Sequence, residues 1–232
     1  MTNKEFEGVA RILDAAKSIK DEAELICKNA SQLQRRSPID KMMAEPEAPG
    51  TIKDGIYLVC DNEIIEYTPA VTEDIEDIKQ RCCGVGVKLG GKSIIVALKD
   101  FADRDDITLT CRPDRSGRDG YKNNYEDAGA DWDGAGNTEH LKAIGLNSAI
   151  TLSGGWYIPA VAQWRFICLF RKEINQALKE LDGDELSGWY WTSTEYSATN
   201  AWYLNLSFGT LNNGRTKDSN RNRVRAVSAF IS

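Results

Sequence analysis

The sequence predicts an α+β protein in which a long N-terminal helix precedes a domain of strands, helices and long irregular loops. Three observations support this fold class. Apolar residues near the N-terminus recur with alternating spacings of three and four. The centre of the chain has short apolar stretches separated by Asp, Asn or Gly, as β-hairpins do. Helical periodicity returns at 164–181 and is followed by aromatic, strand-like segments.

The N-terminal segment has the pattern of a coiled coil. Small and larger apolar residues alternate along its seam, which consists of Val9, Ile12, Ala16, Ile19, Ala23, Ile26, Ala30 and Leu33. We therefore predict an oligomerising helix over 1–35 and a homo-oligomer, with a trimer favoured. The alternative is an amphipathic helix that packs on its own domain. Prolines and charges predict a linker at 36–50, which leaves 51–232 as the folded domain.

Composition limits the class of protein. With 41% hydrophobic and 28% charged residues, the 232-residue chain can form a folded core. The formal net charge of −6 argues against general nucleic-acid binding, which depends on a cationic surface. No apolar run is long enough to span a membrane, and residues 1–20 lack the apolar core of a secretory signal. We expect no membrane insertion and synthesis as a soluble cytoplasmic protein.

The cysteines lack the dense spacing of a disulfide scaffold and form no CxxC pair. We therefore expect reduced, mostly buried thiols, with a disulfide as the alternative. The six positions are Cys27, Cys60, Cys82, Cys83, Cys111 and Cys168.

Two hairpins are predicted in the centre of the chain. Gly55–Tyr67 places Asp61-Asn62 between apolar stretches, and Gly84–Leu98 places Gly90-Gly91 in the same way. From Asp103 to Gly136 the chain is crowded with Asp, Asn, Gly and Arg, which predicts long irregular loops.

One loop in this stretch has the oxygen donors and glycines of a calcium site. The candidate ligands are Asp131, Asp133, Asn137 and Glu139, although the full spacing of an EF-hand loop is missing. The alternative, which we prefer, is that Asn137 or Thr138 caps a helix running through His140 to Ile144. His140 is the only histidine and is expected to be an ordinary surface residue, because no Cys or His lies nearby to complete a zinc site. No other cofactor is expected.

The last third of the chain alternates between helical and strand patterns. Trp164–Leu181 has helical periodicity, Gly188–Tyr196 is an aromatic strand, and Arg223–Phe230 is a closing strand with Val224, Ala226, Ser228 and Phe230 on one face. The arginines of this closing segment are expected to pair with neighbouring carboxylates and not with phosphate.

The order of motifs in this region resembles a known family. WYIP at 156–159, a helix containing Ile174-Asn175, YWTSTEY at 190–196, Ala201-Trp202 and RVRAVSAF at 223–230 resemble the C-type-lectin-like variable proteins of diversity-generating retroelements. That family is related in fold to the major tropism determinant of a bacteriophage and to formylglycine-generating enzymes. The resemblance implies a C-type-lectin-like domain; it is strongest over Gly154–Phe230 and weaker from about Gly50.

In this family, template adenines are randomised in a repeat that encodes the residues before the terminal strand. The resemblance therefore implies variation at asparagine codons, and asparagines cluster here at positions 200, 205, 212, 213, 220 and 222. Between Tyr196 and Asn222, only Trp202 and Lys217 cannot be reached by changing the first two bases of an AAC or AAT codon. This segment, about 196–222, is the predicted variable segment.

Strand periodicity divides the variable segment into two sets. The apolar residues Trp202, Leu204, Leu206 and Leu211 are expected to face the core. The other positions combine the Tyr, Arg, Ser and Asn side chains found in antibody binding sites. We predict an exposed ligand-binding set of Tyr203, Asn205, Ser207, Phe208, Thr210, Asn212, Asn213, Arg215, Thr216, Asp218, Ser219, Asn220, Arg221 and Asn222. The alternative is an ordinary polar hairpin that turns at Asn213-Gly214.

These patterns predict a binding protein and not an enzyme. Formylglycine-generating enzymes need paired cysteines, whereas Cys168 is the only cysteine after Cys111, and a single histidine makes a catalytic triad unconvincing, so no catalytic residue is predicted. We expect an adhesin or receptor-binding protein of a phage tail or fibre tip, located in the virion, with an unknown protein or glycan target on a cell surface. The alternatives are a structural fibre protein, and a calcium-braced glycan lectin, although EPN, QPD and WND motifs are absent.

Overall fold

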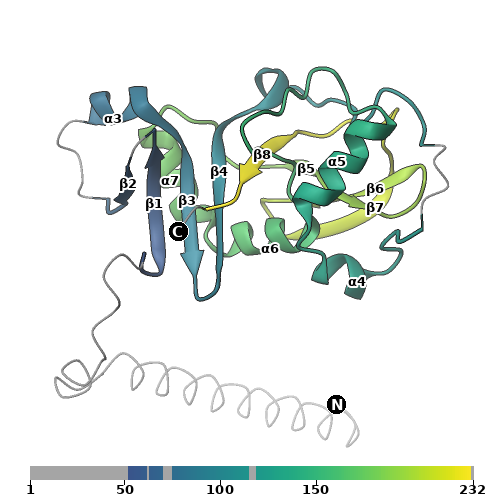
Figure 1. Cartoon of the computed structure of the whole chain (residues 1–232), viewed down its shortest axis with the longest axis horizontal. Coiled ribbons are helices and arrows are strands. Elements are labelled where there is room, and N and C mark those ends of the chain that lie inside the picture. Colours follow the sequence, from purple (N-terminus) through teal and green to yellow (C-terminus); the bar gives the residue numbers. More distant parts are fainter. Residues whose placement is uncertain (1–51, 62, 70–74, 115–118, 231–232) are drawn as a thin grey trace, which may run out of the picture. The chain divides into compact units, whose positions relative to one another are not determined.

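The computed structural model describes residues 52–230 except 62, 70–74 and 115–118. The predicted helix at 1–35 and linker at 36–50 lie outside the described residues. The described part is an α+β domain with two antiparallel sheets, which confirms the predicted α+β class (Figure 1). No helix in this part of the chain combines the length and apolar character needed to cross a bilayer.

The larger sheet contains both the first and the last strand. Its strands are β1 (Gly55–Cys60), β2 (Ile64–Glu66), β3 (Cys82–Leu89), β4 (Lys92–Asp100) and β8 (Arg225–Ser228), in the order β2-β1-β3-β4-β8. Both predicted hairpins are confirmed, because β1 pairs with β2 and β3 pairs with β4. Gly90 has a φ of +58° in the β3–β4 turn, a conformation that glycine adopts without strain.

A disulfide joins Cys60 to Cys82, so the expectation of reduced thiols is wrong for this pair. The antiparallel register of β1 and β3 places the two residues opposite each other. Spacing along the sequence cannot reveal such a contact. Cys83 and Cys111 are exposed, which corrects the expectation that they are buried.

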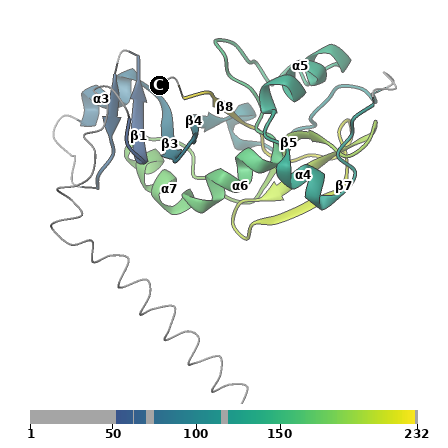
Figure 2. The same cartoon turned by 60° about the horizontal axis from the view of Figure 1, so that its bottom comes forward.

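The predicted helix at 164–181 is two helices, α6 (Val161–Leu169) and α7 (Arg171–Glu180), separated at Phe170. They pack on different sheets: α6 contacts the strands of the smaller sheet, and α7 contacts β1 and β3. One straight helix could not bury both apolar faces, so the chain bends between them. Figure 2 shows the two helices following one another along the domain. A further helix, α3 (Ile75–Arg81), precedes β3.

The smaller sheet contains the predicted variable segment. Its strands are β5 (Trp189–Glu195), β6 (Asn200–Asn205) and β7 (Thr210–Thr216), paired in that order. The predicted aromatic strand is therefore confirmed. The β6–β7 turn lies at 206–209 and not at the alternative position, because the Asn205 side chain accepts the N–H groups of Ser207 and Phe208 at 2.9 and 3.3 Å. The WYIP segment forms an isolated bridge from Tyr157 to Val227 and no regular strand.

Both faces of β5 and β6 are covered, whereas β7 buries only one of its faces. Tyr190, Trp202 and Leu204 belong to the main core together with α6. Trp191, Ala201 and Tyr203 belong to a second core, which also contains Ile107, Leu109 and Val224. The loop region that supplies part of this second core is mostly irregular, as predicted.

The loop region nevertheless contains elements that the sequence did not predict. A short helix, α4 (Tyr125–Ala130), is capped by the Asn124 side chain, and a turn, η1 (Phe101–Arg104), follows β4. The predicted helix around His140 is confirmed as α5 (Gly134–Ile144). Its N-cap is Asp133, which accepts the Gly136 N–H at 2.8 Å, and not Asn137 or Thr138.

Candidate functional site

Two residues of the variable segment are buried anchors. Trp202 is 0% exposed, and its indole N–H donates to the Lys122 carbonyl at 2.6 Å. Its ring packs edge to face against Tyr125 and Tyr196, with centroid distances of 4.9 and 5.6 Å. Lys217 is 1% exposed, and its ammonium contacts the Glu195 carboxylate. These are the two residues that adenine randomisation of an asparagine codon cannot produce.

Lys217 belongs to a charge cluster that the sequence did not reveal. Its Nζ atom lies 3.8 Å from Oδ2 of Asp114. His140 Nε2 lies 3.5 Å from the same oxygen and 3.4 Å from Oε2 of Glu195. Tyr121 donates to Asp114 at 3.0 Å. His140 is therefore half-buried among carboxylates, which corrects its description as an ordinary surface residue.

The cluster has some of the features of a metal site. The ligand atoms of Asp114, His140 and Glu195 lie within 4.8 Å of one another. However, the Lys217 ammonium already lies beside both carboxylates, and it would repel a second cation. The arrangement is therefore explained as a buried charge network. No sequence signal could have found it, because its members come from well-separated parts of the chain and lack any motif spacing.

An aromatic and cationic patch lies on the same sheet. The Arg215 guanidinium lies over the Tyr203 ring at 4.9 Å and over the Trp189 ring at 6.0 Å from their centroids. Its Nη1 donates to the Arg221 carbonyl at 2.8 Å and to the Asn222 side chain. The guanidinium is thus held in place by cation–π and hydrogen-bonding contacts. Among the described residues, no carboxylate forms an ion pair with it.

The predicted binding residues fall into three groups by exposure. The exposed ones are Phe208, Thr210, Asn212, Ser219, Asn220 and Arg221. The half-buried ones are Ser207, Asn213, Arg215, Thr216 and Asp218. The buried ones are Tyr203, Asn205 and Asn222.

The expected exposure of the third group is wrong. Tyr203 faces the second core and lies against Trp191, with ring centroids 5.9 Å apart. The Asn205 side chain accepts hydrogen bonds in the β6–β7 turn, and the Asn222 side chain accepts one from Arg215. These side chains position the surface and are not available as free contacts.

Several exposed polar side chains define the shape of their own loop. Asn220 accepts the Thr216 N–H at 2.8 Å, and Asn212 accepts the Gly214 N–H at 3.0 Å. The segment is therefore ordered by local hydrogen bonds, while its outer positions remain open to solvent.

The calcium candidates do not converge on a common centre. Asp131 Oδ2 accepts hydrogen bonds from the Asn137 amide at 2.8 Å and the Thr194 hydroxyl at 2.7 Å. Asp133 caps α5, and Glu139 pairs with Lys142 at 2.7 Å on the exposed face of that helix. Asp131 and Asn137 thus fix the start of α5 against β5.

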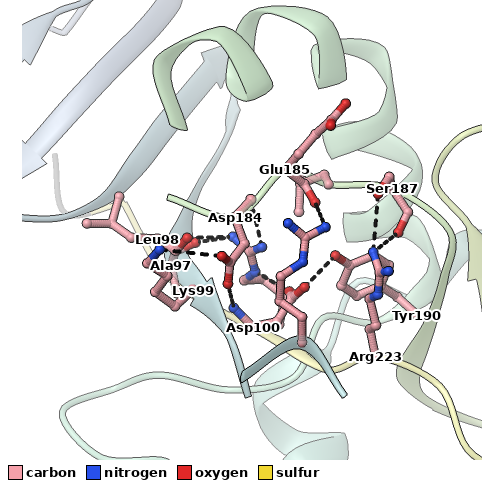
Figure 3. A network of polar contacts seen from close by, with 12 residues as sticks. Ala97, Leu98, Lys99, Asp100, Asp184, Glu185, Ser187, Tyr190 and Arg223 are labelled. Carbon is pink, nitrogen blue, oxygen red and sulfur yellow. Dashed lines mark hydrogen bonds and ion pairs between the residues drawn. The ribbon is translucent and has the colours of Figure 1, made fainter. Parts of the chain in front are cut away.

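A second buried network lies between the sheets and the 184–187 segment (Figure 3). The fully buried Arg225 donates to Asp100 at 2.5 Å and to the Asp184 carbonyl at 2.9 Å. Tyr190 donates to Asp100 at 2.9 Å, and burial together with the Asp100 charge raises the pKa of Tyr190 to about 12. The predicted carboxylate pairing is confirmed for Arg225. Arg223 donates instead to the Ser187 carbonyl at 2.7 Å.

Cys168 lies in a largely apolar environment. Burial raises the pKa of its thiol to about 11, so the thiol is protonated at neutral pH. A thiolate nucleophile is not formed readily there.

Comparisons with known proteins show a similarity among solved structures. No family model matches the chain, and no curated protein matches it. Among solved structures, the chain is similar to a fimbrial protein from Bacteroides ovatus, with a TM-score of 0.55 and 15% identity. The match covers 77% of this chain and 49% of that one, so the chain spans about half the length of the fimbrial protein. At this identity the similarity shows a shared fold alone.

Proposed function

We propose that this chain is an adhesin or receptor-binding protein that displays a diversified surface on a C-type-lectin-like domain. The observation that carries the proposal is the position of Trp202 and Lys217. Both residues lie outside the range of adenine randomisation, and both are buried anchors, whereas side chains between them such as Phe208 and Asn212 are exposed. The two residue types that randomisation of an asparagine codon cannot produce thus occupy structural positions, and the residue types that it can produce include those on the outer surface.

The chemistry of the surface supports a binding role. The Arg215 guanidinium is stacked on Tyr203 and Trp189, and exposed Phe208, Thr210 and Asn212 lie on the same hairpin. Arginine and aromatic side chains dominate binding energy at protein interfaces, and small polar side chains supply adaptable hydrogen bonds. The hairpin combines both.

The topology supports the lectin-like assignment. The first and last strands share the larger sheet, and a separate three-stranded sheet contains the variable segment beside long irregular loops. The sequence resemblance to variable proteins of diversity-generating retroelements covers that same sheet.

The similar solved structure is that of a fimbrial protein, which favours a role on a surface appendage. For this chain we propose the tail fibre or tip of a phage, and hence a virion location. Oligomerisation through residues 1–35, with a trimer favoured, would present several copies of the surface and raise the avidity of weak individual sites. The target remains a protein or glycan on a cell surface.

Sequencing the DNA that flanks the gene, together with many copies of the gene from a population, tests this proposal. We expect a near-copy of the codons for Trp202–Phe230 that differs mainly at adenines, with a reverse transcriptase nearby. Variation among gene copies should concentrate at exposed positions such as Asn212 and Asn220, and Trp202 and Lys217 should be invariant. No near-copy, and substitutions spread evenly over the domain, would reject the diversified surface.

A structural fibre protein of the same fold is the second candidate. It is favoured by the Phe208 ring, which is 83% exposed and would suit a subunit contact. In that case Phe208 would become protected from solvent in the assembled oligomer, and its replacement by serine would lower the oligomer mass in solution.

A further inference from the structure

A groove of about 650 Å³, lined largely by charged and amide residues, lies outside the predicted binding surface. One wall is a face of α7 that carries Lys172, Gln176 and Lys179, and Arg104 and Glu185 contribute from η1 and from the loop after α7. None of these residues belongs to the variable segment. The volume is within the range of about 300–1,000 Å³ that small-molecule sites occupy.

The groove brings together three cationic side chains that lack ion pairs within the described part of the chain. Arg104, Lys172 and Lys179 form no ion pair with any described carboxylate. The nearby Asp182 carboxylate is engaged by Lys79 at 3.1 Å. The groove is also lined by Asp182 and Glu185, so its three cations leave an excess of one positive charge, in a chain whose formal net charge is −6. The three cations form a local site for a negatively charged group.

The wall that presents Arg104 has an unusual backbone conformation. Ala102, Asp103 and Arg104 have φ values of 53°, 50° and 72°, a left-handed turn that non-glycine residues rarely adopt. The Arg104 guanidinium donates to the Glu185 carbonyl at 3.3 Å.

The loop that carries Glu185 is in turn anchored to the buried network. The neighbouring Asp184 accepts the Asp100 N–H at 2.9 Å, and its carbonyl accepts Arg225 (Figure 3). The groove is therefore preorganised by buried interactions.

We propose that this groove binds an anionic saccharide, meaning a sugar with a carboxylate or sulfate group as well as hydroxyl groups. Arg104, Lys172 and Lys179 receive the anionic group. The Glu185 carboxylate and the Gln176 carbonyl accept hydrogen bonds from hydroxyl groups. An acidic peptide fits less well, because it lacks a comparable number of hydroxyl donors for the Glu185 carboxylate and the Gln176 carbonyl. The site is separate from the proposed diversified surface.

Saturation-transfer NMR on the full chain tests this site, with 3′-sialyllactose as the carboxylated probe and lactose as its neutral match. We expect transfer to 3′-sialyllactose and not to lactose. The Lys172→Gln/Lys179→Gln double variant should bind about tenfold more weakly or worse, since charge-assisted hydrogen bonds are lost. Lys142→Gln, an exposed lysine on α5, is the matched control and should leave binding unchanged. A sulfated disaccharide in place of 3′-sialyllactose distinguishes the two anionic groups.

Three results would overturn the proposal. The first is no transfer to either acidic sugar at about 1 mM, the weak limit of specific recognition. The second is equal binding by wild type and the double variant. Binding that is lost in Arg215→Ser but kept in the double variant would count in the same way, because it would place the sugar on the variable surface. The third is that a hexaglutamate peptide binds and the acidic sugars do not. A circular dichroism spectrum of each variant excludes unfolding as the cause of lost binding.

Discussion

The Arg225 network and the outer part of the variable segment differ in where their polar side chains find hydrogen-bond partners. Around Arg225, every hydrogen bond connects distant parts of the chain, and the ion pair with Asp100 joins residues 125 positions apart. Between 206 and 221, polar side chains such as Asn212 and Asn220 bond mainly to their own loop. The first region therefore depends on several partners at once, whereas the second depends on few.

This difference shows how a surface can change while the fold persists. The Arg225 network fixes the last strand to β4 and to the 184–187 segment, and Trp202 and Lys217 fix β6 and β7 to the rest of the domain. The outward-facing side chains between these anchors, such as Phe208, Thr210 and Asn212, are exposed and contribute little to the cores. Substitutions at anchors should therefore unfold the protein, and substitutions at outer positions should not.

The largest effect is expected for Arg225→Met. The substitution leaves the Asp100 carboxylate buried without its cation, which costs about 3–5 kcal/mol in the free energy of unfolding. Urea denaturation followed by tryptophan fluorescence measures the loss. The paired variant Arg225→Met/Asp100→Asn should recover part of it, because the uncompensated charge is removed. A loss below about 1 kcal/mol for the single variant would show that the network is not a stability determinant.

Lys217→Met tests the second anchor and is expected to cost about 3 kcal/mol, since the buried Glu195 and Asp114 carboxylates lose their ammonium neighbour. The neighbouring substitution Thr216→Ala is the matched control, and it should change stability by about 0.5 kcal/mol or less. The same denaturation experiment compares them. Equal effects of the two substitutions would mean that Lys217 is not an anchor and that its burial places no constraint on the segment.

A pH titration tests how much Asp184, a member of the Arg225 network, contributes to stability. Burial alone would raise the pKa of Asp184, but the Asp100 N–H, Lys99 and Arg225 outweigh burial and lower it. A carboxyl group with a depressed native pKa stabilises the fold above its unfolded value of about 3.9, and this contribution disappears as the pH falls through the native pKa. The stability difference between wild type and Asp184→Asn should therefore be largest near pH 7 and narrow towards pH 3. A constant difference would contradict this linkage.

Local patterns predicted most of the regular elements. Alternating apolar residues with Asp-Asn or Gly-Gly between them predicted both hairpins of the larger sheet, and helical periodicity predicted the combined extent of α6 and α7. The helix now seen as α5 was expected from residues able to cap it and not from periodicity. The break at Phe170 could not be predicted, because it depends on which sheet each half of the helix packs against. The Cys60–Cys82 disulfide also depends on strand register.

The candidate site was predicted less completely for a related reason. Period-two alternation separates the two faces of a strand, but it does not show whether the second face is covered by a distant segment. Ile107 and Leu109 cover part of that face, so Tyr203 and Asn222 are buried. The cluster around Lys217 was missed because Asp114, His140 and Glu195 share no sequence spacing.

The smallest effect on stability is expected at Phe208, although it is among the largest side chains of the variable segment. Phe208 is 83% exposed. Its backbone N–H donates to the Asn205 side chain, and any residue other than proline keeps this hydrogen bond. Phe208→Ser should therefore change the free energy of unfolding by about 0.5 kcal/mol or less. Trp202→Ala, the matched aromatic substitution on the same hairpin, should cost about 3–5 kcal/mol. Comparable losses in the free energy of unfolding would show that the turn is part of the core and not free to vary. The expected contrast would mean that stability does not constrain position 208, so that selection can act there on binding alone.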